Sequence, residues 1–239
     1  MDNFLKYTKK ILKLVIKPII YIISWFILLK FDIILKSNVN HFPVKLASLC
    51  FNGSLVYIVN PKLIKYHILD PDVISEKYFV WAGDWDKELI EIDKHEKYEM
   101  MKEIAIENKN YRDTKFYLKA INNLKSQTPL TRNNILLDSE EDIFEYFEKS
   151  KKLYFDIKET GFKLDLAPEI GITIDRNGNI IHFRQGHHTL AIANFLKEKK
   201  VKVRIRAVHK QWLLNQINCN EFLIIGAIKN SFKKLFEVE

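Results

Sequence analysis

The chain has 239 residues, 47% of them hydrophobic and 28% charged, with a formal net charge of +8. This length can bury one sizeable core, and the few glycines and prolines exclude a disordered, linker-rich protein. Residues 1–45 hold eight lysines against Asp2 and Asp32, so this segment carries +6 and the rest of the chain only +2. A near-neutral main domain argues against a general nucleic-acid binder.

The sequence predicts three parts. They are an N-terminal basic and hydrophobic helix (residues 1–50), an α/β domain (51–212) and a C-terminal amphipathic helix (213–239). The two cysteines, Cys50 and Cys219, stand far apart and indicate neither a disulfide framework nor a paired-cysteine metal motif, which suits a reducing cytoplasm.

The N-terminal part is rich in Ile, Leu, Val, Phe and Trp. Its uninterrupted apolar run, between Lys17 and Lys30, has twelve residues. As a helix this run is about 18 Å long, against roughly 30 Å of bilayer hydrocarbon. Lysines at helical spacing form one polar stripe, which is typical of a basic helix lying in the membrane interface. A short spanning anchor and a soluble partner or core helix are the alternatives. The expected membrane-contacting residues are Lys6, Lys10, Lys13, Lys17, Trp25 and Phe26.

Regular elements are predicted next. Residues 55–59 (LVYIV) form a strand that Asn60-Pro61 stops, and residues 62–66 follow as a helical turn. Amphipathic patterns predict helices over residues 95–108, 112–125 and 139–160. Ser139 is expected to cap the last helix and Gly161 to end it.

Between these elements, residues 81–86 (WAGDWD) combine two tryptophans, a glycine and two acids. Such a segment fits neither a helix nor a regular strand, so it predicts a shaped loop. Asp84 and Asp86 would be suitable as Mg²⁺ ligands or as a general base. The alternative is a loop held by tryptophan packing, with its acids facing solvent.

The most informative stretch is residues 169–212. Strands are predicted at 171–175 and 179–183, joined by an Asn-Gly turn. Residues 184–188 (RQGHH) then lead into a helix ending near Leu196. A glycine at a strand-to-helix junction permits a sharp turn and exposes the first helical N–H groups, where the dipole favours an anion such as phosphate. The alternative is a turn without a ligand. The expected phosphate- or nucleotide-binding residues are Arg184, Gln185, Gly186, His187, His188, Thr189 and Arg206.

This order of hairpin, Gly-x-His loop, helix and Val-x-Val strand is similar to the ParB/sulfiredoxin superfamily, whose members hold nucleotide phosphates on a Gly-x-His-Arg-like loop. The Asn60-Pro61 strand end and the Gly-Asp-Trp-Asp loop are also similar to segments of these relatives. The resemblance implies an α+β fold, a small mixed sheet flanked by helices. The chain departs from the pattern at Thr189, where arginine is usual, and it lacks the loop cysteine needed for sulfinic acid repair.

The C-terminal part begins with an alternating strand at residues 201–208, whose polar face includes Arg206. Residues 221–236 predict a last apolar helix, packed either on the domain or on the bilayer. His182, His187, His188 and His209 cluster in the sequence, but adjacent histidines on a helix point about 100° apart. They cannot chelate an ion as an i, i+4 pair does, so we expect no metal site.

Three functions fit these patterns. The first is a membrane-associated, kinase-like phosphotransferase for a small molecule, because the ParB-like relatives include kinases of free serine. Asp84, Asp86 and His188 would be its catalytic residues, and ATP, ADP or CTP with Mg²⁺ its cofactor. The second is a non-enzymatic nucleotide-binding adaptor. The third, a DNA-binding or nuclease protein, is disfavoured by the charge balance. The expected partners are a membrane surface and a small phosphate-containing ligand, with the main domain in the cytoplasm.

Overall fold

The structure is a computed structural model that describes residues 41–44, 47, 55–132, 135–217 and 224–236. The predicted membrane-contacting residues, from Lys6 to Phe26, lie outside these ranges. Among the described residues, no helix has the length and apolarity needed to cross a bilayer.

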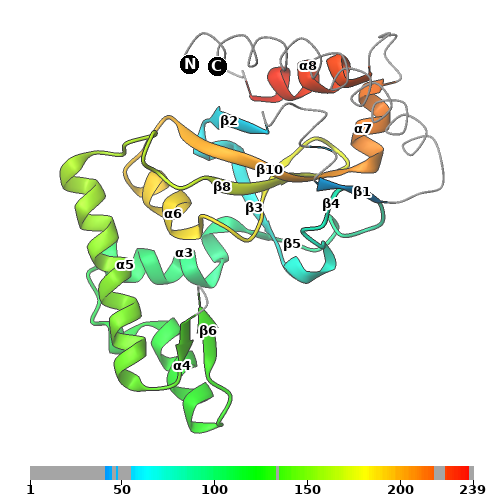
Figure 1. Cartoon of the computed structure of the whole chain (residues 1–239). Coiled ribbons are helices and arrows are strands. Elements are labelled where there is room, and N and C mark those ends of the chain that lie inside the picture. The colour runs from blue at the N-terminus through cyan, green and yellow to red at the C-terminus, as the bar shows by residue number, and fades with distance from the viewer. Residues whose placement is uncertain (1–40, 45–46, 48–54, 133–134, 218–223, 237–239) are drawn as a thin grey trace, which may run out of the picture.

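A mixed eight-stranded sheet forms the centre of the fold (Figure 1). Its strands are β1 (His41–Pro43), β2 (Val56–Val59), β3 (Ile64–Ile68), β4 (Tyr78–Trp81), β5 (Leu89–Glu91), β8 (Ile170–Ile174), β9 (Ile180–His182) and β10 (Val201–His209). They lie in the order β1-β4-β10-β8-β9-β3-β5, with β2 paired to β10. Since β10 runs parallel to β4 and β8 and antiparallel to β2, it is the strand around which the sheet is built.

The predicted hairpin is formed by β8 and β9, which pair antiparallel. All five residues of β8 are buried, as expected of a strand covered on both faces. The side chain of Asp175 organises the turn by accepting hydrogen bonds from the amides of Asn177 (2.8 Å) and Asn179 (2.7 Å). Because these signals are local, the hairpin was predictable from sequence.

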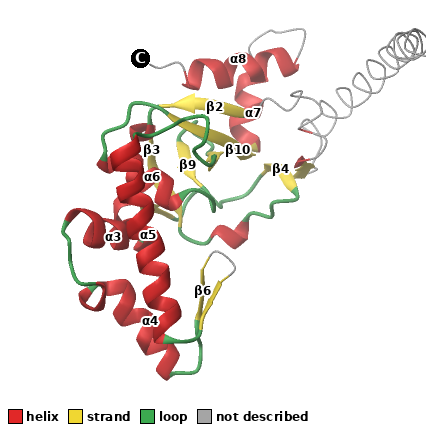
Figure 2. Ribbon diagram, turned by 60° about the vertical axis from the view of Figure 1, so that its left-hand side comes forward, coloured by secondary structure: helices red, strands yellow, loops and turns green. Residues whose placement is uncertain are grey.

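Helices cover the sheet and extend from it (Figures 1 and 2). They are α3 (Glu96–Met101), continued by a π-helical turn (Lys102–Ile106), α4 (Lys115–Lys125), α5 (Glu140–Thr160), α6 (His187–Phe195), α7 (Lys210–Ile217) and α8 (Ile224–Phe236). A small hairpin of β6 (Leu130–Arg132) and β7 (Ile135–Leu137) lies beside α4. The fold is therefore α+β, with a mixed sheet flanked by helices, as predicted.

The ends of α5 are those predicted from sequence. The Ser139 hydroxyl accepts a hydrogen bond from the amide of Asp142 at 3.0 Å, and the helix ends where Gly161 adopts φ 79°. The last helix, α8, packs on the domain: its Phe232 ring stacks on Trp212 and meets Tyr57 edge-on.

One secondary-structure prediction was wrong. Residues 62–66 do not form a helical turn; a 3₁₀ turn at Pro61–Leu63 is followed at once by strand β3. Ile64, His67 and Ile68 are buried, whereas Lys65 and Tyr66 are exposed. This burial pattern is not strictly alternating, so the usual period-two signal of a strand is missing.

Candidate functional site

The loop between β9 and α6 is a sharp left-handed turn. Arg184 and Gly186 have φ values of 59° and 87°, and a Cβ atom on Gly186 would lie 2.8 Å from the Cα of Ile170, so only glycine fits there. The first intrahelical bond runs from the amide of Leu190 to the Gly186 carbonyl at 2.8 Å. The three preceding amides, of residues 187–189, have no acceptor among the described residues.

A pocket of about 480 Å³ opens at this turn. All six predicted loop residues, from Arg184 to Thr189, line it. The other lining residues are Lys97, Leu153, Pro168 and Glu169. Arg206, the seventh predicted ligand residue, lies beside the loop, where its guanidinium donates a hydrogen bond to the side-chain oxygen of Gln185. The structure thus brings the predicted phosphate-binding residues together.

Lys97 is a pocket residue that sequence reasoning missed. It lies in the first turn of α3 and is partly buried, and its ammonium group makes no hydrogen bond or ion pair with any residue that the structure describes. Burial lowers the pKa of its ammonium group, followed by repulsion from Arg132. A lysine on a helix face carries no sequence signal, since its position at the pocket depends on how α3 packs against α6.

The other charged groups at the pocket already have partners. The Arg184 guanidinium donates to the carbonyl of Pro71 at 3.0 Å and to Asp72 at 2.8 Å. The Glu169 carboxylate pairs with Arg204, whose hydrogen bonds lower the pKa of that carboxyl. Lys97 and the helix end therefore leave the pocket electropositive.

The predicted catalytic acids lie elsewhere. Neither Asp84 nor Asp86 lines the Gly186 pocket. Both form ion pairs with Arg176 on the hairpin turn instead. The Arg176 side chain donates through Nε to both Asp86 oxygens, at 3.0 and 2.9 Å, and its amide donates to the same carboxylate at 3.0 Å. Burial raises the pKa of Asp86, but the bonds from Arg176 outweigh burial and the net shift is downward.

The Gly-Asp-Trp-Asp loop lines a second pocket, of about 420 Å³, that includes Trp81, Trp85 and Asp84. Trp85 is buried and Trp81 is half-buried, so of the two predicted indole anchors only Trp85 is fully packed in the core. Asp86 is buried too, whereas Asp84 faces solvent. The geometry gives the loop a clear structural role, since it holds the hairpin turn to β4.

We expect Asp86→Ala to lower the free energy of unfolding by about 3 kcal/mol, because Arg176 would lose its buried partner. Urea unfolding followed by circular dichroism measures this loss. Asp84→Ala is the matched control, and its loss should be far smaller because its carboxylate is 64% exposed. Equal losses in the two variants would contradict the structural role of Asp86 as the buried partner of Arg176.

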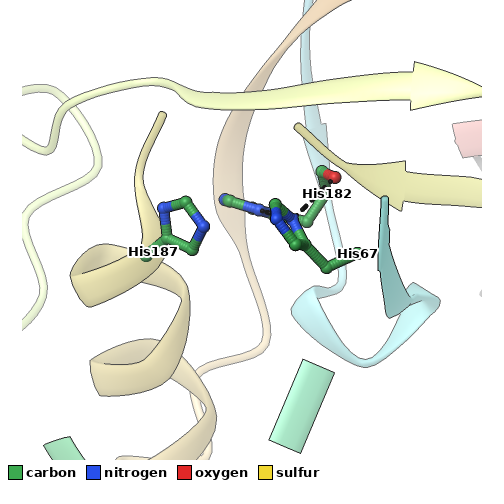
Figure 3. Close-up of side chains that lie close together, drawn as sticks. All are labelled: His67, His182 and His187. Atoms are coloured by element: carbon green, nitrogen blue, oxygen red, sulfur yellow. Dashed lines mark hydrogen bonds between the residues drawn. The ribbon is translucent and has the colours of Figure 1, made fainter. Parts of the chain in front are cut away.

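A cluster of four histidines adjoins the Gly186 loop. His67 on β3 and His182 on β9 are register partners, His187 begins α6, and His95 caps α3 (Figure 3 shows the first three). Ring centroids lie 4.2 Å apart for His182 and His187 and 4.4 Å apart for His95 and His187. Burial lowers the pKa of His67 to about 4 and of His95 to about 3, and it also lowers the pKa values of His182 and His187.

Sequence spacing did not predict this cluster. Its members come from four separate elements, and the contact between His67 and His182 depends on β3, the strand read as a helical turn. His188, a predicted catalytic residue, lies outside it: the Nε2 atom of His188 is 3.2 Å from the Tyr146 hydroxyl, and burial lowers its pKa to about 4. His209, the remaining histidine of the predicted stretch, contacts the Gly83 carbonyl at 2.9 Å.

Comparison with protein-family models, curated proteins and solved structures finds no match to the chain. The relationship to the ParB/sulfiredoxin superfamily therefore stays a prediction from the loop residues and the order of elements.

Proposed function

We propose that the protein binds a phosphate-bearing small molecule in the Gly186 pocket. The observation that carries this proposal is Lys97: this partly buried lysine, whose ammonium group has no partner among the described residues, lines the same pocket as residues 187–189, whose amides are free. A cation and a helix N-terminus converging on one cavity are complementary to a compact anion.

The pocket also suits the rest of such a ligand. Its volume of about 480 Å³ lies within the range of sites for small organic molecules. Leu153 and Pro168 provide apolar surface for a base or a carbon skeleton, while the buried Thr189 completes the first turn of α6. A nucleotide such as ADP, ATP or CTP fits this combination of apolar and anion-binding surface.

The geometry favours binding over phosphotransfer. A kinase needs a carboxylate near the transferred phosphate to accept a proton or to hold Mg²⁺. Asp84 and Asp86 are bound to Arg176 and line no part of this pocket, and Glu169, which does line it, is bound to Arg204. We therefore favour the nucleotide-binding adaptor over the phosphotransferase.

Isothermal titration with ADP, CTP and inorganic phosphate tests the proposal. We expect Lys97→Met to weaken binding roughly 10-fold or more, because it removes a charge-assisted contact worth about 1.5–3 kcal/mol. The matched control is Lys102→Met, in the π-helical turn that continues α3, where an exposed lysine pairs with Glu107 outside the pocket. Gly186 is unsuitable for this test, since any side chain there would clash with Ile170.

Two outcomes would contradict the proposal: no binding of any of these ligands by the wild-type protein, or equal affinities in wild type and Lys97→Met. Release of ADP from ATP in the presence of Mg²⁺ and a hydroxyl-bearing acceptor would instead favour the phosphotransferase.

A further inference from the structure

We propose that His67, His182 and His187 bind a divalent transition-metal ion, for which zinc is the best match. Each of the three side chains offers one ring nitrogen, and these nitrogens lie within 4.8 Å of one another (Figure 3). Three imidazoles are a usual ligand set for zinc, copper, nickel and iron, and a poor one for Mg²⁺ or Ca²⁺. This inference does not rest on the proposed phosphate binding.

The spacing of the nitrogens is close to that of a metal site. With Zn–N bonds of about 2.0–2.1 Å, two ligands at a tetrahedral angle lie about 3.3–3.4 Å apart. The Nδ1 atoms of His67 and His182 are 3.0 Å apart. His182 and His67 are register partners on paired strands and His187 begins a helix five residues after His182, so the backbone holds the three rings side by side, with centroids 4.2–5.1 Å apart.

The hydrogen bond made by His182 selects the protonation form that a metal requires of this ring. The Nε2 atom of His182 lies 2.9 Å from the Gln185 carbonyl, so it carries the proton and leaves the Nδ1 lone pair facing the cluster. The Nδ1 atom of His67 lies 3.0 Å from the Nδ1 atom of His182 and 3.1 Å from the His182 carbonyl, so it carries a proton in the metal-free protein, and this proton must move to Nε2 before Nδ1 can bind a metal. The Gln185 carbonyl is the kind of backbone acceptor that orients many metal-binding histidines.

His187 provides an independent observation. Its Nε2 atom is buried and has no hydrogen-bond partner in the part of the chain that the structure describes. An unsatisfied buried polar atom costs about 1–3 kcal/mol, so native proteins rarely leave one. A metal ion held between the three rings would satisfy this nitrogen.

His95 packs against two of the three proposed ligands, His67 and His187, without being a ligand itself. Its Nδ1 atom accepts a hydrogen bond from the amide of Lys97 at 3.2 Å, so the proton sits on Nε2. The ring stacks on His187 at 4.4 Å and meets His67 edge-on at the same distance, which shields the cluster from solvent. The site therefore has three protein ligands and one open position for water or an anion.

The alternative to a metal site is a metal-free cluster in which a shared proton links the histidine rings. Without a metal, one of the two Nδ1 atoms of His67 and His182 donates to the other, and the rings form a neutral hydrogen-bonded cluster in the core. Lys97 lies close enough to disfavour protonation of all three rings, and it opposes a bound cation in the same way. An anionic fourth ligand such as hydroxide would offset that repulsion.

The test uses the full chain, freed of metal by a chelator and then titrated with Co²⁺ and Zn²⁺. We expect one Co²⁺ per chain to give the intense visible absorption of a four-coordinate site, Zn²⁺ to displace it, and Zn²⁺ to raise the melting temperature. His187→Phe, which keeps an aromatic ring in the cluster and the amide of residue 187, should abolish all three effects. His209→Gln is the matched control and should keep them.

Should His187→Phe fail to fold, X-ray absorption of the zinc-loaded wild type decides the matter. We expect three nitrogen ligands at about 2.0–2.1 Å with imidazole scattering. A coordination shell dominated by oxygen, no Co²⁺ spectrum in the wild type, or an unchanged spectrum in folded His187→Phe would overturn the metal site. Lys97→Met is expected to lose phosphate affinity while keeping the Co²⁺ spectrum. A failure of the metal proposal can therefore be distinguished from a failure of the proposed phosphate binding.

Discussion

Acidification of the metal-free protein from pH 7 to pH 5 is expected to lower its stability by about 2 kcal/mol for each histidine whose pKa the fold lowers to 4 or below. Burial lowers the pKa values of His67 and His188 to about 4 and that of His95 to about 3, against 6.5 in the unfolded chain. These three residues alone account for roughly 6 kcal/mol, which is comparable to the total stability of many domains.

The sign follows from proton uptake. Below pH 6.5 the unfolded chain binds more protons than the folded chain. The free energy of unfolding therefore decreases as the pH is lowered, until the folded-state pKa values near 4 are reached. The contribution of the buried histidines is fully present above pH 6.5. Asp86 and Glu169 have lowered pKa values, so their contributions are lost only at more acidic pH and do not affect this window.

Urea unfolding at a series of pH values, in the presence of a chelator, measures the effect. We expect the midpoint to fall steeply between pH 6.5 and pH 5. In His188→Phe, which removes one titrating group outside the metal cluster, the fall should be shallower by about 2 kcal/mol over the same range. A stability that stays constant from pH 7 to pH 5 would show that the histidines are not held neutral in the fold.

The parts of the fold that were predictable from sequence are those with local causes. The Asn-Gly turn between β8 and β9 gave the hairpin, and the capping residue Ser139 and the terminating Gly161 gave the limits of α5. Gly186 likewise marked the strand-to-helix turn with free amides. In each case the residue that causes the structure lies within a few positions of the structure it causes.

The rest depended on contacts between distant segments. Arg176 and Asp86 are ninety positions apart, so nothing in the sequence showed that the predicted catalytic acid has a structural partner. Lys97 reaches the Gly186 pocket only because α3 packs on α6, and His67 reaches His182 only through the pairing of β3 with β9. The spacing of residues along the chain does not indicate such long-range contacts.

Gly171→Ala is expected to lower the free energy of unfolding by on the order of 5 kcal/mol, at the extreme of single substitutions. A Cβ atom on Gly171 would lie 2.3 Å from the carbonyl oxygen of Phe183. That oxygen cannot move freely, because the Phe183 amide donates to the Gly171 carbonyl at 2.8 Å and the Gly171 amide donates to the Gln185 carbonyl at 2.9 Å. On its other side, Gly171 pairs with Arg204 of β10.

Gly83→Ala is the control that separates the cost of this steric clash from the backbone cost of replacing a glycine. Gly83 has φ 94° with open space around its Cα, so alanine there costs only the backbone preference, about 1–2 kcal/mol. Urea unfolding of both variants gives the comparison, and a loss in Gly171→Ala no larger than in Gly83→Ala would contradict the steric explanation.

The position of the clash also determines what happens to binding in any Gly171→Ala protein that still folds. Relief requires the backbone from Phe183 to Gln185 to move away from β8, and this segment links His182 to the amides at the start of α6. Affinities for phosphate and for the metal ion should therefore fall together in this variant. In Lys97→Met, by contrast, the affinity for phosphate should fall while the affinity for the metal ion is kept, because this side chain is not a metal ligand and its loss does not move the backbone that both sites share.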